Sequence, residues 1–473
     1  MELAKLIKVD VEKCVNCHQC IAVCTTKFAN DGSGDHVEVN NELCIGCGEC
    51  LKACTHEART YVDDFNEFMT DIKKEGNIIA IIAPAVAASF PNTYMNLNGW
   101  LKSLGISACF DVSFGAELTV KSYLEYINSK NPKHVIAQPC PAIVNYIQIY
   151  QPELIQHLAP ADSPMMHTMK MVKEFYPDYK NHKMLVVSPC IAKKREFEEV
   201  GIGDYNVTIQ SIQNYLSENK IDLKKYPEVE FSNDKAERAV LFSTPGGLLM
   251  TAEREVPEIR SKTRKIEGPQ VVYKYFEKLQ KQISTNRAPL LIDCLNCELG
   301  CNGGTGTLLK EYSADEIEYY VEERKRKMQK EYKTDSNNKL NHEKLNQVIS
   351  KYWTPELYTR KYQNHSKYFK QKIKIPDKNS LKSIYESMHK YSDKDILNCA
   401  SCGYNSCEMM ATAIYNNLNK KENCHFFLSH EVSTKTEELV IKSNKVITQK
   451  QEIIRQSESL LDFIQKIRQY IHG

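Results

Sequence analysis

Two cysteine runs, about thirty residues apart near the start of this 473-residue chain, constrain its fold more than any other feature. Each run has the spacing Cys-x2-Cys-x2-Cys-x3-Cys. Iron-sulfur clusters need thiolate ligands, and in this spacing the fourth cysteine of each run ligates the cluster of the other run. The runs therefore predict two [4Fe-4S] clusters, one held by Cys14, Cys17, Cys20 and Cys54 and the other by Cys44, Cys47, Cys50 and Cys24.

The high cysteine content favours metal binding over disulfides. The chain has 18 cysteines, and its N-terminus lacks a signal peptide's apolar core, so we expect a cytoplasmic, reducing location in which disulfides are rare. A pair of zinc sites is the alternative for the N-terminal runs, although two evenly spaced quartets are unusual for zinc. Thr25 and Thr55 stand where proline usually follows the fourth cysteine, a change that affects the turn more than the ligation.

Charge and hydropathy exclude two classes of partner. Lys plus Arg number 62 against 60 for Asp plus Glu, so no overall field draws the chain to nucleic acid or to an anionic membrane. No apolar run is long enough to cross a bilayer. We therefore expect neither a nucleic-acid nor a membrane partner.

Residues 77–307 alternate short apolar runs with longer amphipathic stretches, which predicts an α/β fold with parallel sheets flanked by helices. Strands are expected at 78–83, 134–137, 184–187, 239–242 and 290–292. Three of these runs end in a cysteine motif, and Pro139 and Pro189 stop two of them directly before a cysteine. Functional groups gather past the carboxyl ends of parallel strands. The pattern therefore predicts one large inorganic group held by four cysteines of these three motifs, with Gly300, Gly303 and Gly304 letting the backbone approach it.

The three motifs resemble the signature segments of iron-only ([FeFe]) hydrogenases, and the N-terminal runs resemble a bacterial ferredoxin. The resemblance implies that the [4Fe-4S] part of an H-cluster is held by Cys140, Cys190, Cys297 and Cys301. Cys301 would also bridge to a two-iron [2Fe] subsite with CO, cyanide and azadithiolate, and Lys193 matches the lysine that hydrogen-bonds a cyanide. The implied reaction is the heterolytic splitting of H2 and its reversal from protons. The implied partners are a redox protein such as ferredoxin and hydrogenase maturation proteins.

Three departures from the family surround this implied site. Catalytic members carry a proton-relaying cysteine immediately before the first ligand, where this chain has Pro139. Ser188 and Leu295 replace two family methionines, which alters the surroundings of the two irons. We therefore expect low turnover and consider Cys294, Glu253 and Glu117 as replacement proton carriers. The alternative is that Cys294, like Cys109, is a small buried core residue.

A second cysteine group and a heptad repeat follow the central region. The group resembles the four-cysteine [4Fe-4S] module of redox and corrinoid proteins, with zinc as the alternative, and comprises Cys399, Cys402, Cys407 and Cys424. Apolar residues then recur every seven positions, which predicts a coiled-coil-like helix that pairs with a signalling partner or in a homodimer, with a simple surface helix as the alternative. The repeating residues are Val432, Leu439, Val446, Ile453, Leu460 and Ile467. Regulatory members of the hydrogenase family often carry a four-cysteine [4Fe-4S] module of this kind after the catalytic domain.

Four parts are expected: a ferredoxin-like domain at 1–70, an H-cluster domain at 71–375, a four-cysteine [4Fe-4S] domain at 376–430 and a heptad-repeat helix at 431–473. Ser313-x-x-Glu316 predicts a capping box and Thr354-Pro355 a helix start. The favoured function is slow, reversible H2 oxidation and proton reduction in an H2-sensing or regulatory role. The alternatives are a fast ferredoxin-linked metabolic hydrogenase and a non-hydrogenase iron-sulfur cluster assembly protein that lacks the two-iron subsite.

Overall fold

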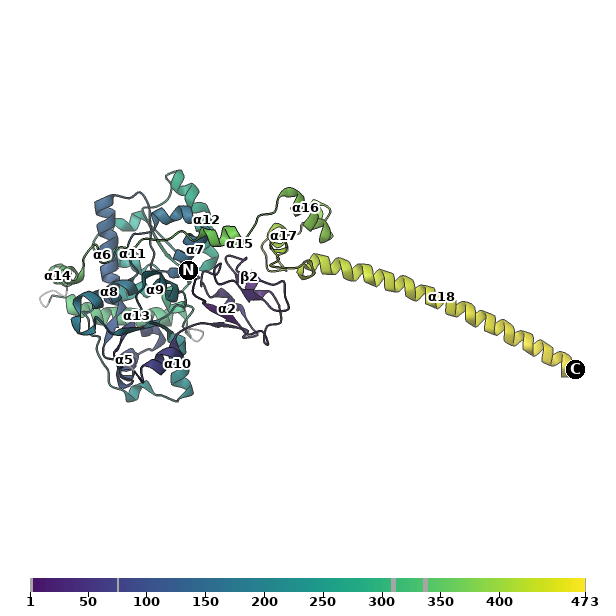
Figure 1. Cartoon of the computed structure of the whole chain (residues 1–473), viewed down its shortest axis with the longest axis horizontal. Helices are drawn as coiled ribbons and strands as arrows, with labels where there is room; N and C mark the ends of the chain where they lie inside the picture. The colour runs from purple at the N-terminus through teal and green to yellow at the C-terminus, as the bar shows by residue number, and fades with distance from the viewer. Residues whose placement is uncertain (1–2, 75, 308–311, 335–338, 473) are drawn as a thin grey trace. The chain divides into compact units, whose positions relative to one another are not determined.

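A computed structural model describes residues 3–74, 76–307, 312–334 and 339–472 (Figure 1). The chain forms two compact units, one of residues 1–31 and 35–373 and the other of residues 32–34 and 374–473. The first unit therefore contains both N-terminal cysteine runs and the central region. The division into four domains stays a prediction.

The N-terminal cysteine runs fold as two similar halves. Each run enters a five-residue helix at its third cysteine, and two short antiparallel strand pairs flank these helices. The helices are α1 (Gln19–Val23) and α2 (Glu49–Ala53), and the pairs are β1 (Ile7–Val9) with β4 (Arg59–Tyr61) and β2 (Asn30–Asp31) with β3 (Glu38–Val39). Elements this short bury few apolar side chains, so metal clusters would supply much of the stability of this part.

Two parallel sheets form the centre of the first unit. The larger has the strand order β6-β5-β8-β9 and the smaller the order β10-β11-β7. The central strand β5 is Ile-Ile-Ala-Ile-Ile and is buried on both faces, as expected of a parallel strand covered by helices. The strands are β5 (Ile78–Ile82), β6 (Cys109–Asp111), β7 (Val135–Ile136), β8 (Lys183–Ser188), β9 (Tyr205–Thr208), β10 (Thr263–Glu267) and β11 (Leu291–Leu295).

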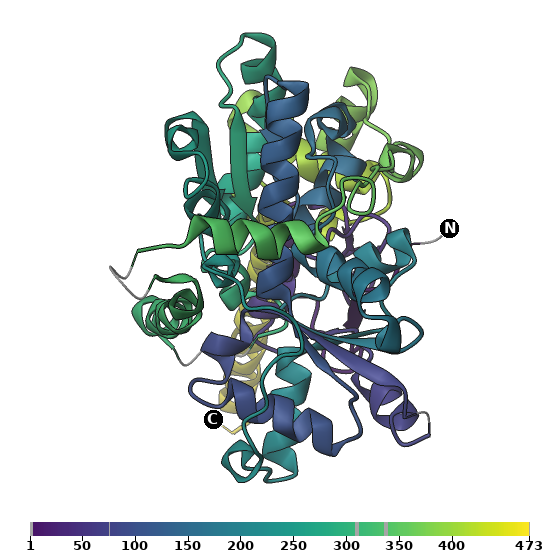
Figure 2. The same cartoon turned by 90° about the vertical axis from the view of Figure 1, so that its left-hand side faces the viewer.

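Helices surround both sheets (Figures 1 and 2). The longest in this unit, α6, begins after Asp111, whose carboxylate accepts a hydrogen bond from the Ser113 amide at 2.8 Å. The helices are α3 (Phe65–Asp71), α4 (Val86–Ser89), α5 (Tyr94–Ser103), α6 (Val112–Lys130), α7 (Pro141–Tyr150), α8 (Pro164–Phe175), α9 (Lys193–Val200), α10 (Ile209–Glu218), α11 (Gly247–Ala252), α12 (Pro269–Ser284), α13 (Ala314–Gln329), α14 (His342–Tyr352) and α15 (Ser366–Lys372).

Four of the five expected strands are confirmed, and two expectations are wrong. Residues 239–242 form a 3-10 helix, Ala239–Ser243, because the Glu117 carboxylate accepts hydrogen bonds from the amides just before and at its start and so curls the chain. Thr354-Pro355 leads into a turn, and the next helix begins only at Ser366. The capping box at Ser313 and Glu316 is confirmed.

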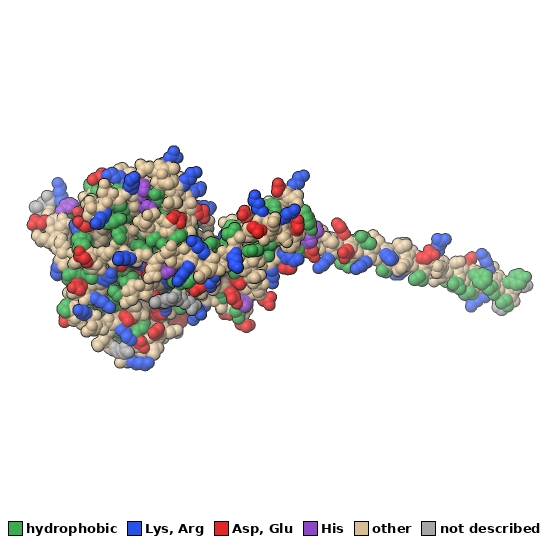
Figure 3. All heavy atoms as spheres, turned by 45° about the horizontal axis from the view of Figure 1, so that its top comes forward, with side chains coloured by type: hydrophobic (Ala, Val, Ile, Leu, Met, Phe, Trp, Pro, Cys, Tyr) green, Lys and Arg blue, Asp and Glu red, His purple; other side chains and the backbone are tan. Residues whose placement is uncertain are grey.

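The second unit combines a small cysteine module with one long helix. Its helices are α16 (Lys378–Ser387), α17 (Cys407–Tyr415) and α18 (His425–His472). The heptad residues of α18 are all exposed, and apolar side chains gather toward its C-terminal end (Figure 3). In the part of the chain that the structure describes, no helix combines the length and the apolarity that a membrane span requires.

Candidate functional site

The N-terminal cysteines line two separate small cavities. One is lined by Cys14, Cys17, Cys20 and Cys54, and the other by Cys24, Cys44, Cys47 and Cys50. In each cavity about 20 Å³ is open to the centre of a water molecule. The fourth cysteine of each run thus lies with the first three of the other run. Both groupings agree with the predicted ligand sets, which remain predictions.

The central cysteines line one larger cavity. Cys140 precedes α7, Cys190 follows β8, and Cys297 and Cys301 follow β11, so three distant segments bring four sulfurs together. About 80 Å³ of this cavity is open to the centre of a water molecule, four times the space in either N-terminal cavity. The central site therefore has room for more than a single cubane.

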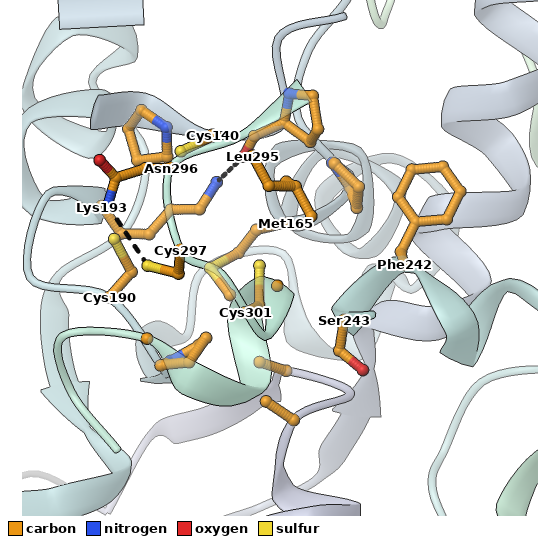
Figure 4. A pocket seen from close by; sticks show the side chains of 18 of the residues that line it. Cys140, Met165, Cys190, Lys193, Phe242, Ser243, Leu295, Asn296, Cys297 and Cys301 are labelled. Carbon is orange, nitrogen blue, oxygen red and sulfur yellow. Dashed lines mark hydrogen bonds between the residues drawn. The ribbon is translucent and has the colours of Figure 1, made fainter. Parts of the chain in front are cut away.

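The central cavity has a sulfur-rich side and an apolar side (Figure 4). Cys140, Cys190 and Cys297 lie on one side, Phe242 lies on the other, and Cys301 lies between them. The remaining apolar lining includes Met165 and Leu295. Cys301 can thus serve both sides, which fits a cubane joined through one sulfur to a second metal unit.

Glycines hold the Cys301 loop against the strand ends. A Cβ atom on Gly304 would lie 2.2 Å from the Pro189 carbonyl oxygen, and one on Gly300, where φ is +61°, would lie 2.5 Å from that of Ser243. Only glycine fits such close backbone approach and the left-handed conformation. Gly300 and Gly304 also line the cavity, so the missing side chains make room for neighbouring backbone, and the approach to a ligand stays a prediction.

Burial makes the four central thiols weak acids. It raises the pKa of Cys190 to about 11 and that of Cys297 to about 12, and it also raises the pKa of Cys140 and Cys301. Neighbouring sulfurs add to the rise at Cys190, Cys297 and Cys301. Four thiolates in this cavity therefore need bound metal, which must displace the protons. This chemistry fits an iron-sulfur centre.

Lys193 brings one cation to the cavity wall. Its Nζ donates to the Glu196 carboxylate at 2.5 Å, to Ser163 Oγ at 3.0 Å and to the Pro139 carbonyl oxygen at 3.3 Å. Glu196 in turn accepts from Arg360 at 2.8 Å. Despite its burial, Glu196 has a lowered pKa because Lys193 and Arg360 flank it. The ammonium group is thus fixed where it can meet an anionic ligand in the cavity.

The structure does not place the other proposed proton carriers at the cavity. Cys294 points away from the cavity, because alternate residues of β11 face opposite sides of the strand and Leu295 faces the cavity. The Sγ atom of Cys294 lies 3.4 Å from the Ala137 carbonyl oxygen. Glu253 pairs with Arg260 at 2.5 Å. Glu117 pairs with the buried Arg254 at 2.8 Å. Cys109 is a buried core residue packed among apolar side chains.

The C-terminal cysteines also converge. Cys399, Cys402, Cys407 and Cys424 line one small cavity with about 10 Å³ open to the centre of a water molecule. Lys390 lines the same cavity, and its ammonium lies 3.9 Å from the centre of the Phe426 ring. Sequence spacing predicted this set, but it gave no signal for Lys390.

Comparisons with known proteins agree with this geometry. Residues 76–305 match the family model for the iron only hydrogenase large subunit, C-terminal domain, and residues 6–55 match a 4Fe-4S dicluster domain. The periplasmic [Fe] hydrogenase large subunit of Nitratidesulfovibrio vulgaris is 29% identical over 283 residues, 52% of this chain and 67% of that protein. Iron hydrogenase 1 of Clostridium pasteurianum is 27% identical over 299 residues, 54% of this chain and 52% of that protein.

A solved structure of a variant of the [FeFe]-hydrogenase HydA1 from Chlamydomonas reinhardtii aligns with a TM-score of 0.49 at 18% identity, covering 64% of this chain and 100% of that one. The fold and the site define an iron-sulfur oxidoreductase with an α/β core and a dicluster domain. Within it, the central region, residues 76–305, belongs to the iron-only hydrogenase family. The chain spans about half of the length of the Clostridium relative and about two thirds of the Nitratidesulfovibrio subunit.

Proposed function

We propose that the chain is a hydrogenase that slowly and reversibly oxidises H2 and reduces protons at an H-cluster, in an H2-sensing or regulatory role. The central cavity carries this proposal. It combines four convergent cysteines with an apolar extension beyond Cys301 and about four times the space of the cavities lined by the N-terminal cysteines.

In this proposal Cys140, Cys190, Cys297 and Cys301 hold a [4Fe-4S] unit, and Cys301 also holds the two-iron subsite with CO, cyanide and azadithiolate. When bound, this group supplies the heterolytic chemistry of H2. The N-terminal cysteines hold two further [4Fe-4S] clusters, and Cys399, Cys402, Cys407 and Cys424 hold a third. These clusters would exchange electrons with a redox partner such as ferredoxin, and maturation proteins would supply the two-iron subsite.

The protein's own contribution is to position the subsite and to exclude water. Lys193 Nζ would donate a hydrogen bond to a cyanide, with Glu196 and Ser163 fixing its direction. The apolar side chains of Met165, Phe242 and Leu295 keep bulk water from the far side of the cavity. Electrostatic contacts are stronger in such a dry site than in water.

The lining of the cavity supports low turnover. Among its described lining residues, the titratable side chains are the four cysteines and Lys193. Pro139 occupies the position before Cys140 and has no proton to give. Proton delivery would therefore depend on Lys193 or on water that enters transiently. A fast metabolic hydrogenase would need an efficient relay at this point.

The assembly-protein alternative needs only a cubane. A site built for a cubane alone resembles the two N-terminal cavities, whereas the central one extends past Cys301. The extra apolar space favours the hydrogenase, and it has no use in an assembly protein that lacks the two-iron subsite.

We further propose that α18 pairs with the same helix of a second copy in a cytoplasmic homodimer. Its six heptad residues are all Val, Leu or Ile and are all exposed, so two identical helices in register would bury each of them against its equivalent in the other copy. Such a helix could pass the redox state of the C-terminal cluster to a signalling domain.

Infrared spectroscopy tests the central claim. Protein produced anaerobically with the maturation proteins should show bands of iron-bound CO and cyanide and a measurable but low H2 turnover. Lys193→Met should weaken or abolish the bands. Lys194→Met is the matched control, because Lys194 pairs with Asp64 at 2.5 Å and does not line the cavity. Absence of the bands in the wild-type protein, with its iron-sulfur clusters intact, would favour the assembly protein.

A further inference from the structure

Arg59 is a buried cation that lines both N-terminal cavities. It begins β4 and is only 7% exposed. Its Nη2 donates to Cys20 Sγ at 3.1 Å and to the Val37 carbonyl oxygen at 3.3 Å. Cys20 belongs to one predicted ligand set, and the second cavity, lined by Cys50, includes the same guanidinium. One side chain therefore faces both predicted clusters.

The contacts of Arg59 are incomplete within the protein. Its Nη1 is buried and has no hydrogen-bond partner among the described residues. A buried guanidinium without a nearby anion is strongly destabilising. The unpaired donor is thus explained if the two cavities contain sulfur-rich anions.

The internal repeat shows that packing alone does not require an arginine here. The two cysteine runs are offset by thirty positions, and the residue thirty positions before Arg59 is Ala29. Ala29 is buried and lines one of the cavities. The first half of the repeat therefore places a methyl group at the cavity of Cys24, Cys44, Cys47 and Cys50, whereas the second half places a guanidinium at both cavities.

A cation at the position of Arg59 changes the electron affinity of a cluster bound in either N-terminal cavity. A thiolate-ligated cluster gains one negative charge on reduction, so a nearby buried positive charge stabilises the reduced state more than the oxidised one. Hydrogen bonds to cluster sulfurs act in the same direction and are among the main determinants of cluster potentials. Burial strengthens both effects because solvent screens them little.

We propose that Arg59 sets the reduction potentials of both N-terminal clusters, raising them together through one guanidinium that donates to sulfur on each side. The proposal rests on the presence of these clusters, which is part of the proposed function, and it is independent of hydrogen chemistry at the central site. Arg59 is a positioning residue for electron transfer and has no contact with substrate.

Redox titration of the cluster-loaded full chain, followed by electron paramagnetic resonance, tests the proposal. Arg59→Gln should lower both midpoint potentials, with an approximately tenfold weaker reduction equilibrium, which is about 59 mV for a one-electron couple. Arg59→Lys retains the positive charge but loses the forked guanidinium that can donate to two sulfurs, so both potentials should fall less than in Arg59→Gln. Lys8→Gln removes an exposed cation on β1 and should leave both potentials unchanged.

Iron and sulfide content and the cluster signals are measured first. Clusters that are present in Arg59→Gln with unshifted potentials, or with a shift at one cluster only, would overturn the role of Arg59 while leaving the proposed function intact. If Arg59→Gln does not assemble its clusters, Arg59→Lys decides, and wild-type potentials in that variant would contradict the proposal. Wild-type protein without the two N-terminal clusters would instead contradict the proposed function.

Discussion

Asn296 joins the dicluster region to the central site through a single side-chain nitrogen. Its Nδ2 donates to the carbonyl oxygen of Cys47 at 3.2 Å and to Cys297 Sγ at 3.3 Å, and Figure 4 draws the second of these bonds as a dashed line. Its Oδ1 accepts from the Tyr273 hydroxyl at 2.7 Å, which fixes the amide. Cys47 lines an N-terminal cavity and Cys297 the central one. A hydrogen-bonded connection between two proposed clusters therefore runs through this residue.

Asn296→Asp should lower the potential of the central cluster. The change keeps the shape of the side chain but replaces a donor to the Cys297 sulfur with a carboxylate oxygen. A hydrogen bond to a charged group contributes about 1.5–3 kcal/mol, so we expect a tenfold or larger weakening of the reduction equilibrium. Redox titration with infrared detection measures the potential of the central cluster. Tyr273→Phe leaves both Nδ2 contacts and should shift the potential much less, and equal potentials in Asn296→Asp and wild type would contradict the prediction.

Cys294→Ala and Glu253→Gln should leave H2 turnover within about twofold of the wild type. Cys294 lies on the face of β11 opposite the cavity, and Glu253 is paired with Arg260. Neither side chain can exchange a proton directly with a group in the cavity. Hydrogen assays on the matured variants check this. A loss of tenfold or more, with clusters and infrared bands intact, would restore the replaced residue as a proton carrier.

Asp293 should make the protein less stable as pH rises from about 4 to 6. Burial raises its pKa to about 6, whereas an unfolded aspartate titrates near 3.9, so the folded state holds the extra proton between these values. Stability therefore falls across that window by up to about 3 kcal/mol and stays lower above it. Asp293→Asn cannot ionise and should be more stable than the wild type at pH 7.5 by about 1–3 kcal/mol, with a smaller difference at pH 5.

Denaturant unfolding at the two pH values measures this difference. Asn at position 293 can still accept the Leu249 amide hydrogen bond, which is 3.1 Å long in the wild type. The exposed Asp178 is the control, since Asp178→Asn should change stability little at either pH. An equal or lower stability of Asp293→Asn at pH 7.5 would contradict the buried, ionised carboxylate.

Light scattering should show that the full chain is a dimer, and that the dimer separates into monomers when carboxylates replace apolar heptad residues of α18. Leu439→Asp with Ile453→Asp places carboxylates where apolar side chains would meet, and each buried Leu or Ile contributes about 1.5–3 kcal/mol. Asn444→Asp with Gln451→Asp adds the same charge outside the heptad positions and should leave the dimer intact. A wild-type monomer at all concentrations would refute the homodimer and leave a different signalling protein as the partner of α18.

Local sequence was sufficient to predict a ligand set or a strand where neighbouring residues in the chain form it. Cysteine spacing predicted which sulfurs would lie together in the two N-terminal cavities and in the C-terminal one, whereas the central set was predicted from three strand-end motifs and the family resemblance. The apolar runs of β5 and β8 predicted parallel strands because strands buried on both faces consist mostly of apolar residues. The polar edge strand β10, Thr-Arg-Lys-Ile-Glu, gave no such signal because it is only partly buried.

The sequence by itself determined the metal chemistry of this protein, since sixteen of its cysteines fall into four sets of four and soft sulfur selects iron-sulfur clusters. Only the tertiary structure decided what surrounds those sulfurs. It turned Cys294 away from the central cavity, placed Arg59 at both N-terminal cavities and aimed Asn296 at both Cys47 and Cys297. Such relationships join residues far apart in the chain, and their distances depend on how the elements pack, which no local pattern encodes.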